Sequence, residues 1–288
     1  MGITDYYKNG LTMSFEIFPP KTKEGEDKLF DELNILATYN PAFISVTYGA
    51  GGSTRDKTLD LAEKIRDKYV IDPLIHFTCV GANREEIREY IDKVSSMNFK
   101  NILALRGDPP KGEANFVPAK NGFNYVNELI EFIKSIDDFS IAVAGYPEKH
   151  PEASSLDEDI DNLKKKIDAG GEIIFTQLFF DNNAFLRYVE KARSKNIVVP
   201  IVPGIMPVTS ESQIKRFTEM CGAAIPKKLS EKLEKCNNET DVCKIGIEYS
   251  IEQCNELLKN DIPGFHFYPL NKSEFVKTII DNLDVKFL

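Results

Sequence analysis

Short apolar runs alternate with longer segments of helical periodicity along the whole chain. The apolar runs predict strands, over 12–18, 42–48, 74–79, 101–106, 140–146, 172–180, 198–205 and 265–268. The segments between them predict helices, near 24–39, 55–69, 84–98, 123–136, 156–169, 182–195, 210–221 and 271–284, with a further helical stretch near 226–259. Asn182 is expected to cap the helix that begins there, because asparagine is a favoured N-cap residue.

Eight strands that alternate with eight helices predict a parallel sheet closed into an α/β (β/α)₈ TIM barrel. The stretch near 226–259 is then an extra helical insertion before the eighth strand. An open doubly wound sheet is the alternative. Because no linker or low-complexity segment interrupts the pattern, we expect one domain over residues 1–288.

Composition excludes several classes of protein. A net charge of −9 argues against a nucleic-acid partner, which requires clustered Lys and Arg. The five cysteines are odd in number and form no C-x-x-C pair, which favours reduced thiols over disulfides or a zinc site. The N-terminus lacks an apolar signal core, and no apolar run reaches the roughly 20 residues of a membrane span. We expect a soluble, cytoplasmic protein with no membrane partner.

Two acids stand where apolar strands end. Glu16 is the only charge in MSFEIF, and Asp108 directly follows ALRG. A lone acid in a buried strand is costly unless it is paired or does chemistry. An ion pair with a neighbouring arginine explains one such acid, but two at strand ends favour an active site.

Other polar residues also fall at the predicted carboxyl ends of the strands, where (β/α)₈ barrels place their active sites. They are Thr47, His76, Tyr146, His150, Gln177 and Tyr268. Motifs for nucleophilic hydrolysis and metal catalysis are missing, and YGAGGSTR lacks the last glycine of a dinucleotide-binding loop. A nucleotide cofactor bound in another way stays open. Lys165 and Lys166 could meet its diphosphate or could form a solvated helix face.

Eight strings match one family in order along nearly the whole chain. They are SFEIFPPK (14–21), ISVTYGAGGSTRDKT (44–58), HFTC (76–79), ALRGDPP (104–110), AGYPEKHPEA (144–153), DAGGEIIFTQLFFD (168–181), IVPGIMPV (201–208) and FHFYPLN (265–271). The chain resembles the catalytic barrel of the bacterial-type methylenetetrahydrofolate reductase family.

The resemblance implies one catalytic barrel that binds FAD at the carboxyl ends of its strands. It implies a ping-pong reduction of 5,10-methylenetetrahydrofolate to 5-methyltetrahydrofolate, with NADH or NADPH as hydride donor, in one-carbon and methionine metabolism. It also implies a homo-oligomer.

The resemblance assigns roles to individual residues by matching position. Glu16 corresponds to the general acid that protonates the folate nitrogen, and burial in an apolar strand is expected to raise its pKa. Asp108 corresponds to a carboxylate beside the flavin pyrimidine and the folate pterin that makes the reduced flavin a better hydride donor. The other substrate-binding positions are Gln177 and Gln213, which orient folate, Phe217, which packs on the nicotinamide, and Tyr268 and Lys272.

The remaining matched positions hold FAD. They are Thr47, His76, Arg106, Gly107, Asp108, Tyr125, Tyr146, His150, Asp159, Asn162, Lys165 and Lys166. Lys165 and Lys272 stand where the family usually has Arg, so each offers a point charge in place of a bidentate fork.

Three alternatives remain beside this reading. The first is another flavin barrel such as proline dehydrogenase, which the contexts of Glu16 and Gln177 disfavour. The second is the same folate chemistry with electrons delivered by a protein partner, which Gln213 and Phe217 disfavour. The third is a scaffold subunit without turnover, which the polar set at the strand ends disfavours.

Overall fold

The strands form one parallel sheet in the computed structural model, which describes residues 1–48, 55–107 and 116–288. They are β1 (Thr12–Ile17), β2 (Ile44–Val46), β3 (Pro73–Thr78), β4 (Asn101–Leu105), β5 (Ser140–Gly145), β6 (Ile173–Thr176), β7 (Ile201–Val202), β8 (Gly204–Ile205) and β9 (Gly264–Phe267). The hydrogen-bonded order of the strands in the sheet is β7-β6-β5-β4-β3-β2-β1-β9-β8.

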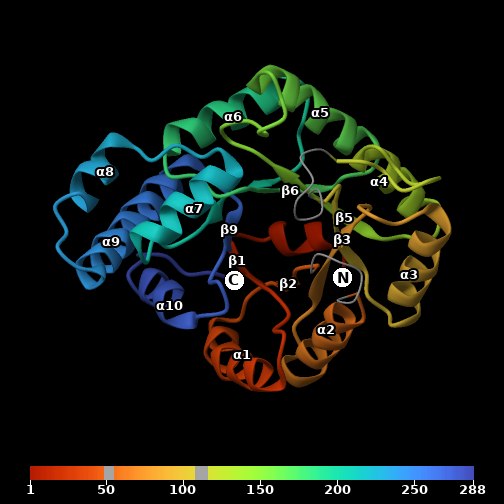
Figure 1. Ribbon diagram of the computed structural model, residues 1–288, viewed down its shortest axis with the longest axis horizontal. Helices are drawn as coiled ribbons and strands as arrows, with labels where there is room; N and C mark the ends of the chain where they lie inside the picture. Colours follow the sequence, from red (N-terminus) through yellow and green to blue (C-terminus); the bar gives the residue numbers. More distant parts are fainter. Residues whose placement is uncertain (49–54, 108–115) are drawn as a thin grey trace.

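The helices surround this sheet as a ring (Figure 1). They are α1 (Lys23–Leu36), α2 (Arg55–Tyr69), α3 (Arg84–Ser96), α4 (Val126–Lys134), α5 (Leu156–Asp168), α6 (Asn182–Ser194), α7 (Glu211–Cys221), α8 (Lys227–Leu233), α9 (Glu239–Leu257) and α10 (Ser273–Asp281). Short 3₁₀ segments add η1 (Ile3–Tyr7), η2 (Ala37–Tyr39) and η3 (Leu258–Asn260).

The sheet closes at Pro203. β7 pairs with β6 on one side of this proline, and β8 pairs with β9 on the other. The predicted strand 198–205 is thus one segment that proline divides, since proline has no N–H to donate to a ladder. The carbonyl oxygen of Pro203 accepts from the backbone N–H of His266 at 3.0 Å, so the segment stays joined to β9. The barrel is confirmed, and the open-sheet alternative is wrong.

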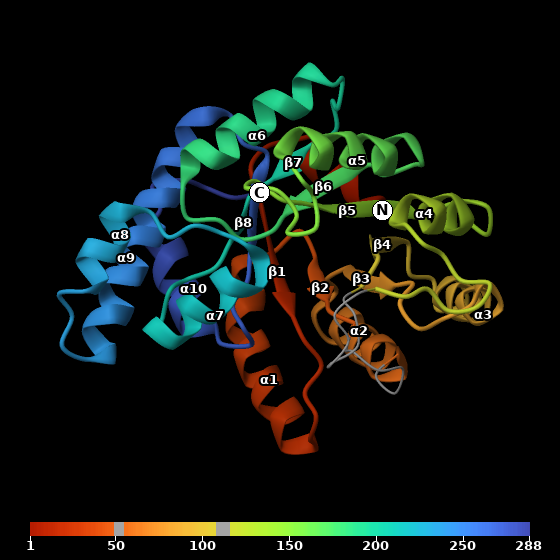
Figure 2. The ribbon, with the colours of Figure 1, turned by 45° about the horizontal axis from the view of Figure 1, so that its top comes forward.

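Three helices lie between β8 and β9, and their roles differ from the prediction. Helix α9 packs against both α6 and α10, so it occupies the ring position between them. Helix α7 lies over the barrel and α8 lies outside α9 (Figures 1 and 2). The additional elements are therefore α7 and α8. The prediction that the whole stretch 226–259 is the insertion was wrong.

Two apolar regions support the barrel. Outward-facing residues of the strands, such as Phe15 and Ile17 on β1, pack beneath the helices. Inward-facing residues fill the amino-terminal half of the barrel together with η1, and this inner cluster contains Ile3, Phe43, Leu74, Leu103, Ala142, Ile173, Phe175 and Val202. Successive residues of a strand face opposite sides. The residues two and four positions after each of these inward-facing strand residues therefore also face inward, nearer the carboxyl ends of the strands.

Asn182 does not cap α6, and that prediction was wrong. The N-cap is Asp181, whose carboxylate accepts from the backbone N–H of Asn183 at 2.9 Å. The buried Asn182 amide donates to the Gln253 carbonyl oxygen at 3.1 Å and to the Glu256 carboxylate at 2.6 Å. The side chain therefore ties α6 to α9.

All five cysteines are free thiols, and the residues outside 49–54 and 108–115 contain no group of three or more potential metal ligands. Within the same segments, every helix is too short or too polar to cross a membrane.

Candidate functional site at the carboxyl ends of the strands

Glu16 faces into the barrel between two histidines. Its Oε2 atom lies 3.4 Å from Nε2 of His76 on β3 and 3.7 Å from Nε2 of His266 on β9. About a quarter of the Glu16 side chain is exposed, whereas both histidines are buried. The strand pairings explain this arrangement, because β1 pairs directly with β9 and lies one strand away from β3.

His266 is anchored on both ring nitrogens. Nδ1 lies 2.7 Å from the Ser14 hydroxyl on β1, and Nε2 lies 3.4 Å from the Ser45 hydroxyl on β2. The ring is stacked on Phe43 and packs against Phe175, with centroid separations of 5.9 and 4.9 Å. The imidazole is therefore held by contacts from β1, β2 and β6 and from Phe43, which precedes β2.

The charge of Glu16 depends on these two histidines. Burial raises the pKa of Glu16, but the hydrogen bond with His266 and the charges of His76 and His266 outweigh it. The net result is a pKa of Glu16 below its ordinary value, so the expectation of a raised pKa was wrong. Burial also lowers the pKa of His76 to about 4, with Glu16 opposing the shift. His76 is thus neutral near pH 7.

Tyr268 lies beside the same site. Its hydroxyl donates to the Thr176 carbonyl oxygen at 2.6 Å, and its ring stands edge-on to His266 at 5.3 Å. Burial and the charge of Glu16 keep the pKa of the Tyr268 phenol well above its ordinary value. Tyr268 therefore stays protonated as a hydrogen-bond donor.

A second cluster lies on the loop between β5 and α5 and on α5 itself. The His150 ring stands edge-on to Tyr146 at 4.7 Å, and the His150 backbone N–H donates to the Asp159 carboxylate at 3.0 Å. Lys166 donates to the Ala144 carbonyl oxygen at 3.0 Å, and burial lowers its pKa while Asp159 raises it. Burial raises the pKa of Asp159.

Arg106, at the end of β4, joins this cluster. Its guanidinium makes a two-pronged ion pair with Glu152, with both N–O distances 2.6 Å. Gly107 follows with a left-handed φ of +88°, and a Cβ on it would lie 2.6 Å from Cγ1 of Val80. Only glycine fits this position without strain.

The structure places the other predicted residues less centrally. Thr47 and Gln177 are half-buried at the ends of β2 and β6, and Gln177 Oε1 accepts from the Leu178 N–H at 2.9 Å. Lys165 is exposed and donates to Asn162 at 2.9 Å, and Tyr125 is 64% exposed. Asp108 lies outside the described residues.

The three remaining residues that were predicted to bind substrate lie on α7 and directly before α10. The Gln213 amide accepts from the backbone N–H of Thr209 at 2.6 Å and donates to the Pro207 carbonyl oxygen at 3.1 Å. Phe217 packs against the apolar cluster that Tyr268 also contacts. Lys272 is exposed at the N-cap of α10.

Sequence reasoning did not assign Ser14, Thr78 or His266 to the site. Thr78 follows His76 by two residues, and its buried hydroxyl has no hydrogen-bond partner among the described residues. Ser14 and His266 each precede a predicted site residue by two. Residues two positions apart on a strand face the same side. The residues two positions from Glu16, His76 and Tyr268 could therefore have been predicted to face the site.

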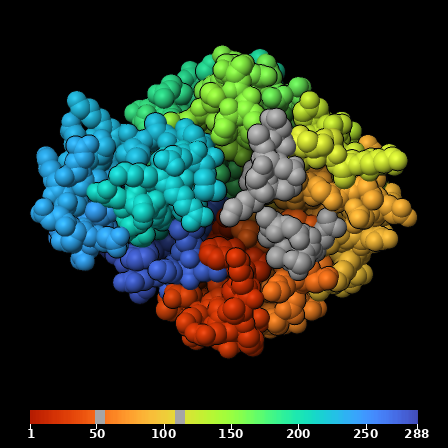
Figure 3. All heavy atoms as spheres, viewed as in Figure 1, coloured from red at the N-terminus to blue at the C-terminus, as the bar shows by residue number. Residues whose placement is uncertain are grey.

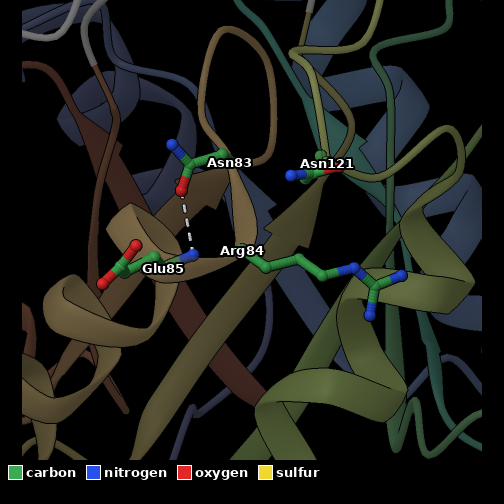
Figure 4. A pocket seen from close by; sticks show the side chains of 5 residues that line it. Asn83, Arg84, Glu85 and Asn121 are labelled. Carbon is green, nitrogen blue, oxygen red and sulfur yellow. Dashed lines mark hydrogen bonds between the residues drawn. The ribbon is translucent and has the colours of Figure 1, made fainter.

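Two hollows lie elsewhere on the molecule. One of about 580 Å³ is lined by Asn83, Arg84, Glu85, Asn121 and Gly122 at the start of α3, where Asn83 caps the helix (Figure 4). The other, of about 590 Å³, lies between α9 and α10. Neither hollow is lined by Glu16, His76 or His266. The candidate site is therefore identified by its charged and polar side chains and not by these hollows. In Figure 3, α7 and the segment after β1 border the centre of the face above the barrel.

Comparisons with known proteins bear on this site. The family model described as methylenetetrahydrofolate reductase matches residues 3–284. A relative from Arabidopsis thaliana, methylenetetrahydrofolate reductase (NADH) 1, is 39% identical over 94% of this chain and 48% of its own length. The 5,10-methylenetetrahydrofolate reductase of Salmonella typhimurium is 36% identical over 96% of this chain and 92% of its own length. The chain thus spans about half the length of the plant relative.

A solved structure also resembles the fold. A Clostridium thermocellum protein that binds two copies of 5-methyl-5,6,7,8-tetrahydrofolic acid superposes with a TM-score of 0.64. It is 17% identical, and the match covers 97% of this chain and 95% of that one.

The fold and the site define a (β/α)₈ barrel with an acid and two histidines at the carboxyl ends of its strands. The family match extends over nearly the whole of this barrel. The chain belongs to the methylenetetrahydrofolate reductase family.

Proposed function

We propose that this chain is a single catalytic barrel that reduces 5,10-methylenetetrahydrofolate to 5-methyltetrahydrofolate, with FAD as cofactor and a reduced nicotinamide as hydride donor. The observation that carries the proposal is Glu16, an inward-facing carboxylate between two buried histidines, in a chain of this family. The name of the plant relative includes NADH, which supports a nicotinamide as the electron source.

The β5–α5 cluster fits a cofactor that carries a diphosphate. Arg106 and Lys166 bring positive charge to the ends of β4 and β5. Nε2 of His76 and the Thr78 hydroxyl are buried without hydrogen-bond partners among the described residues, which is unfavourable unless a bound group or water meets them.

The residues proposed to hold FAD are those implied by the family resemblance. They are Thr47, His76, Arg106, Gly107, Asp108, Tyr125, Tyr146, His150, Asp159, Asn162, Lys165 and Lys166. FAD, when bound, supplies the group that takes up a hydride from the nicotinamide and passes it to the folate. Asp108 would contribute a negative charge there.

Glu16 would act on the folate itself. Its carboxyl group donates a proton to the folate nitrogen, and the bond between that nitrogen and the methylene carbon then breaks to give an electrophilic iminium. The two histidines hold the pKa of Glu16 below its ordinary value. Apolar rings that cover its exposed quarter would remove water and raise the pKa, so the proton would be held in the substrate complex.

One pocket would serve both substrates in turn. Gln177 at the end of β6 and Gln213 on α7 would orient the folate, and Lys272 would offer a positive charge to its tail. Phe217 would pack on the nicotinamide. Phe217 and Tyr268 contact the same apolar cluster, which supports a shared site between α7 and the barrel.

Anaerobic flavin spectroscopy tests this function. The purified protein should show flavin absorbance, NADH or NADPH should bleach it, and 5,10-methylenetetrahydrofolate should restore it. A colourless protein that FAD cannot reconstitute would contradict the cofactor proposal. Bleaching by reduced ferredoxin or a viologen, but by neither nicotinamide, would instead support electron delivery by a protein partner.

We also propose a homo-oligomer, as the family resemblance implies. Light scattering on the eluting protein peak gives its mass directly. A mass equal to the 32.6 kDa of one chain would contradict this proposal.

A further inference from the structure

We propose that His266 is a positioning residue for Glu16. Ser14 holds Nδ1 of the ring, so that His266 presents its Nε2–H to the carboxylate that forms when Glu16 gives its proton to the folate nitrogen. This inference rests on the proposed function and deepens it, because it assigns to a buried histidine the stabilisation of the charge that the reaction creates.

The geometry around the ring supports this role. The Ser14 hydroxyl is 2.7 Å from Nδ1, whereas its other acceptor, the Phe265 carbonyl oxygen, is 3.4 Å away. A serine that donates to Nδ1 leaves the proton of a neutral imidazole on Nε2, since one nitrogen then accepts and the other donates. Nε2 faces Ser45 at 3.4 Å and Glu16 at 3.7 Å.

His76 does not offer the same support. Its Nε2 is nearer to Glu16, at 3.4 Å, but has no hydrogen-bond partner among the described residues. His266 is instead anchored through Ser14 and packed against Phe43 and Phe175. An orientation that is fixed before the reaction stabilises a developing charge without reorganisation during it.

The proton balance of the step is simple. The O–H bond of the Glu16 carboxyl breaks, an N–H bond forms on the folate nitrogen, and the negative charge stays on the carboxylate beside His266. Glu16 regains a proton from solvent after the product leaves, since about a quarter of its side chain is exposed. The titratable groups that face Glu16 in the described structure are His76 from β3, His266 from β9 and Tyr268, which directly follows β9.

The tautomer of His266 can be measured without any ligand. The chain has three histidines, so a spectrum of protein labelled with ¹⁵N-histidine contains three imidazoles, which single substitutions assign. We expect the Nε2–H tautomer for His266 in the unmodified chain and a shift towards Nδ1–H in Ser14→Ala. An Nδ1–H tautomer in the unmodified chain would overturn the proposal.

The titration of Glu16 gives a second readout that is independent of turnover. Carboxyl ¹³C shifts follow it, assigned by the signal that Glu16→Gln removes. Ser14→Ala should move the Glu16 titration to higher pH, because an unprotonated Nε2 favours the protonated acid. Ser45→Ala is the matched control, a buried serine on the neighbouring strand whose loss should cause no upward shift. An unmoved titration in Ser14→Ala would overturn the inference.

The loaded enzyme supplies the kinetic test. His266→Phe keeps a ring against Phe43 and Phe175 but removes the donor. It should slow reoxidation of the flavin by folate about 10- to 100-fold, the equivalent of one hydrogen bond to a charged group, and leave bleaching by nicotinamide unchanged. His266→Gln, which restores an N–H donor, should recover part of the rate.

Equal loss of both half-reactions in His266→Phe, or no recovery in His266→Gln, would contradict the positioning role. A protein without flavin or folate turnover would instead contradict the proposed function, while the two magnetic-resonance results would still decide the arrangement of His266 and Glu16.

Discussion

The hydroxyl of Tyr268 lies 2.6 Å from the carbonyl oxygen of Thr176, to which it donates a hydrogen bond across the short strand β8. Thr176 ends β6 and Tyr268 directly follows β9, the two strands that pair with β7 and β8 on either side of Pro203. Gly204 makes this contact possible, because the Tyr268 side chain and the Thr176 carbonyl oxygen occupy the space that a Cβ at this position would need. A Cβ at position 204 would stand 2.2 Å from the Thr176 oxygen and 2.7 Å from the Tyr268 hydroxyl.

Gly204→Ala should therefore destabilise the protein by about 3 kcal/mol or more, at the upper end for overpacking, because backbone cannot move aside as a side chain can. Urea unfolding measures the loss. Gly2→Ala is the control, since its added Cβ would meet ordinary contacts at 3.5 Å. If Gly204→Ala matched the unmodified chain in stability, the close packing of Tyr268 on β8 would be incorrect.

Gly107→Ala combines a conformational penalty with a clash. The left-handed φ of +88° costs a residue with a side chain about 1–2 kcal/mol, and the Cβ would approach Val80 to 2.6 Å. Gly81→Ala separates the two effects, because Gly81 also has a positive φ, +69°, but open space around it. We expect a larger loss of stability and of bound FAD in Gly107→Ala than in Gly81→Ala. Equal behaviour of the pair would exclude the clash.

Glu16→Gln tests the general acid. The amide keeps the size of the side chain but cannot donate a carboxyl proton, so folate reduction should fall by about 10²- to 10⁴-fold. Bleaching of the flavin by nicotinamide requires no proton on the folate and should be unchanged. Rapid-mixing absorbance measures the two half-reactions separately. Equal loss in both would indicate a structural role for Glu16.

Asn182→Ala and Asp181→Ala compare a tertiary contact with a helix cap on adjacent residues. Asn182→Ala removes two hydrogen bonds to α9, one of them to a carboxylate, and should cost about 2–3 kcal/mol. Asp181→Ala removes the N-cap and should cost about 1 kcal/mol. Denaturant unfolding of the two variants measures both. The opposite order would mean that α6 depends more on its cap than on α9.

The same pair shows how far sequence could predict this fold. The alternation of apolar and helical segments predicted the barrel. The spacing of hydrophobic residues, every two in a strand and every 3.6 in a helix, is a local property that can be read from the sequence. The choice of Asp181 over Asn182 as cap could not be predicted. Both are good N-cap residues, and α9, to which Asn182 is hydrogen-bonded, lies far along the chain. Likewise, burial of Glu16 was visible in MSFEIF, but the histidines that reverse its pKa come from two other strands.

Asp108 limits the comparison at the site itself. Its role as a negative charge beside the flavin stays a prediction, because it lies outside the described residues. The positions implied for FAD divide into a half-buried group around the β5–α5 loop and exposed residues such as Tyr125 and Lys165. Sequence matching could assign both groups to one ligand, but burial and contacts distinguish them.

His76 should make the protein sensitive to acid. Burial lowers its pKa to about 4 in the folded state, from an ordinary value near 6.5. Below about pH 6.5 the unfolded chain binds a proton that the folded protein does not, so the free energy of unfolding falls as the pH falls towards 4. The complete loss is on the order of 3 kcal/mol. His76→Gln should lack this component. The difference in the free energy of unfolding between His76→Gln and the unmodified chain, measured in urea from about pH 7.5 to 4.5, should therefore change below about pH 6.5 and level off above it. A difference that is independent of pH would show that His76 titrates alike in both states, and the buried neutral histidine beside Glu16 would then be wrong.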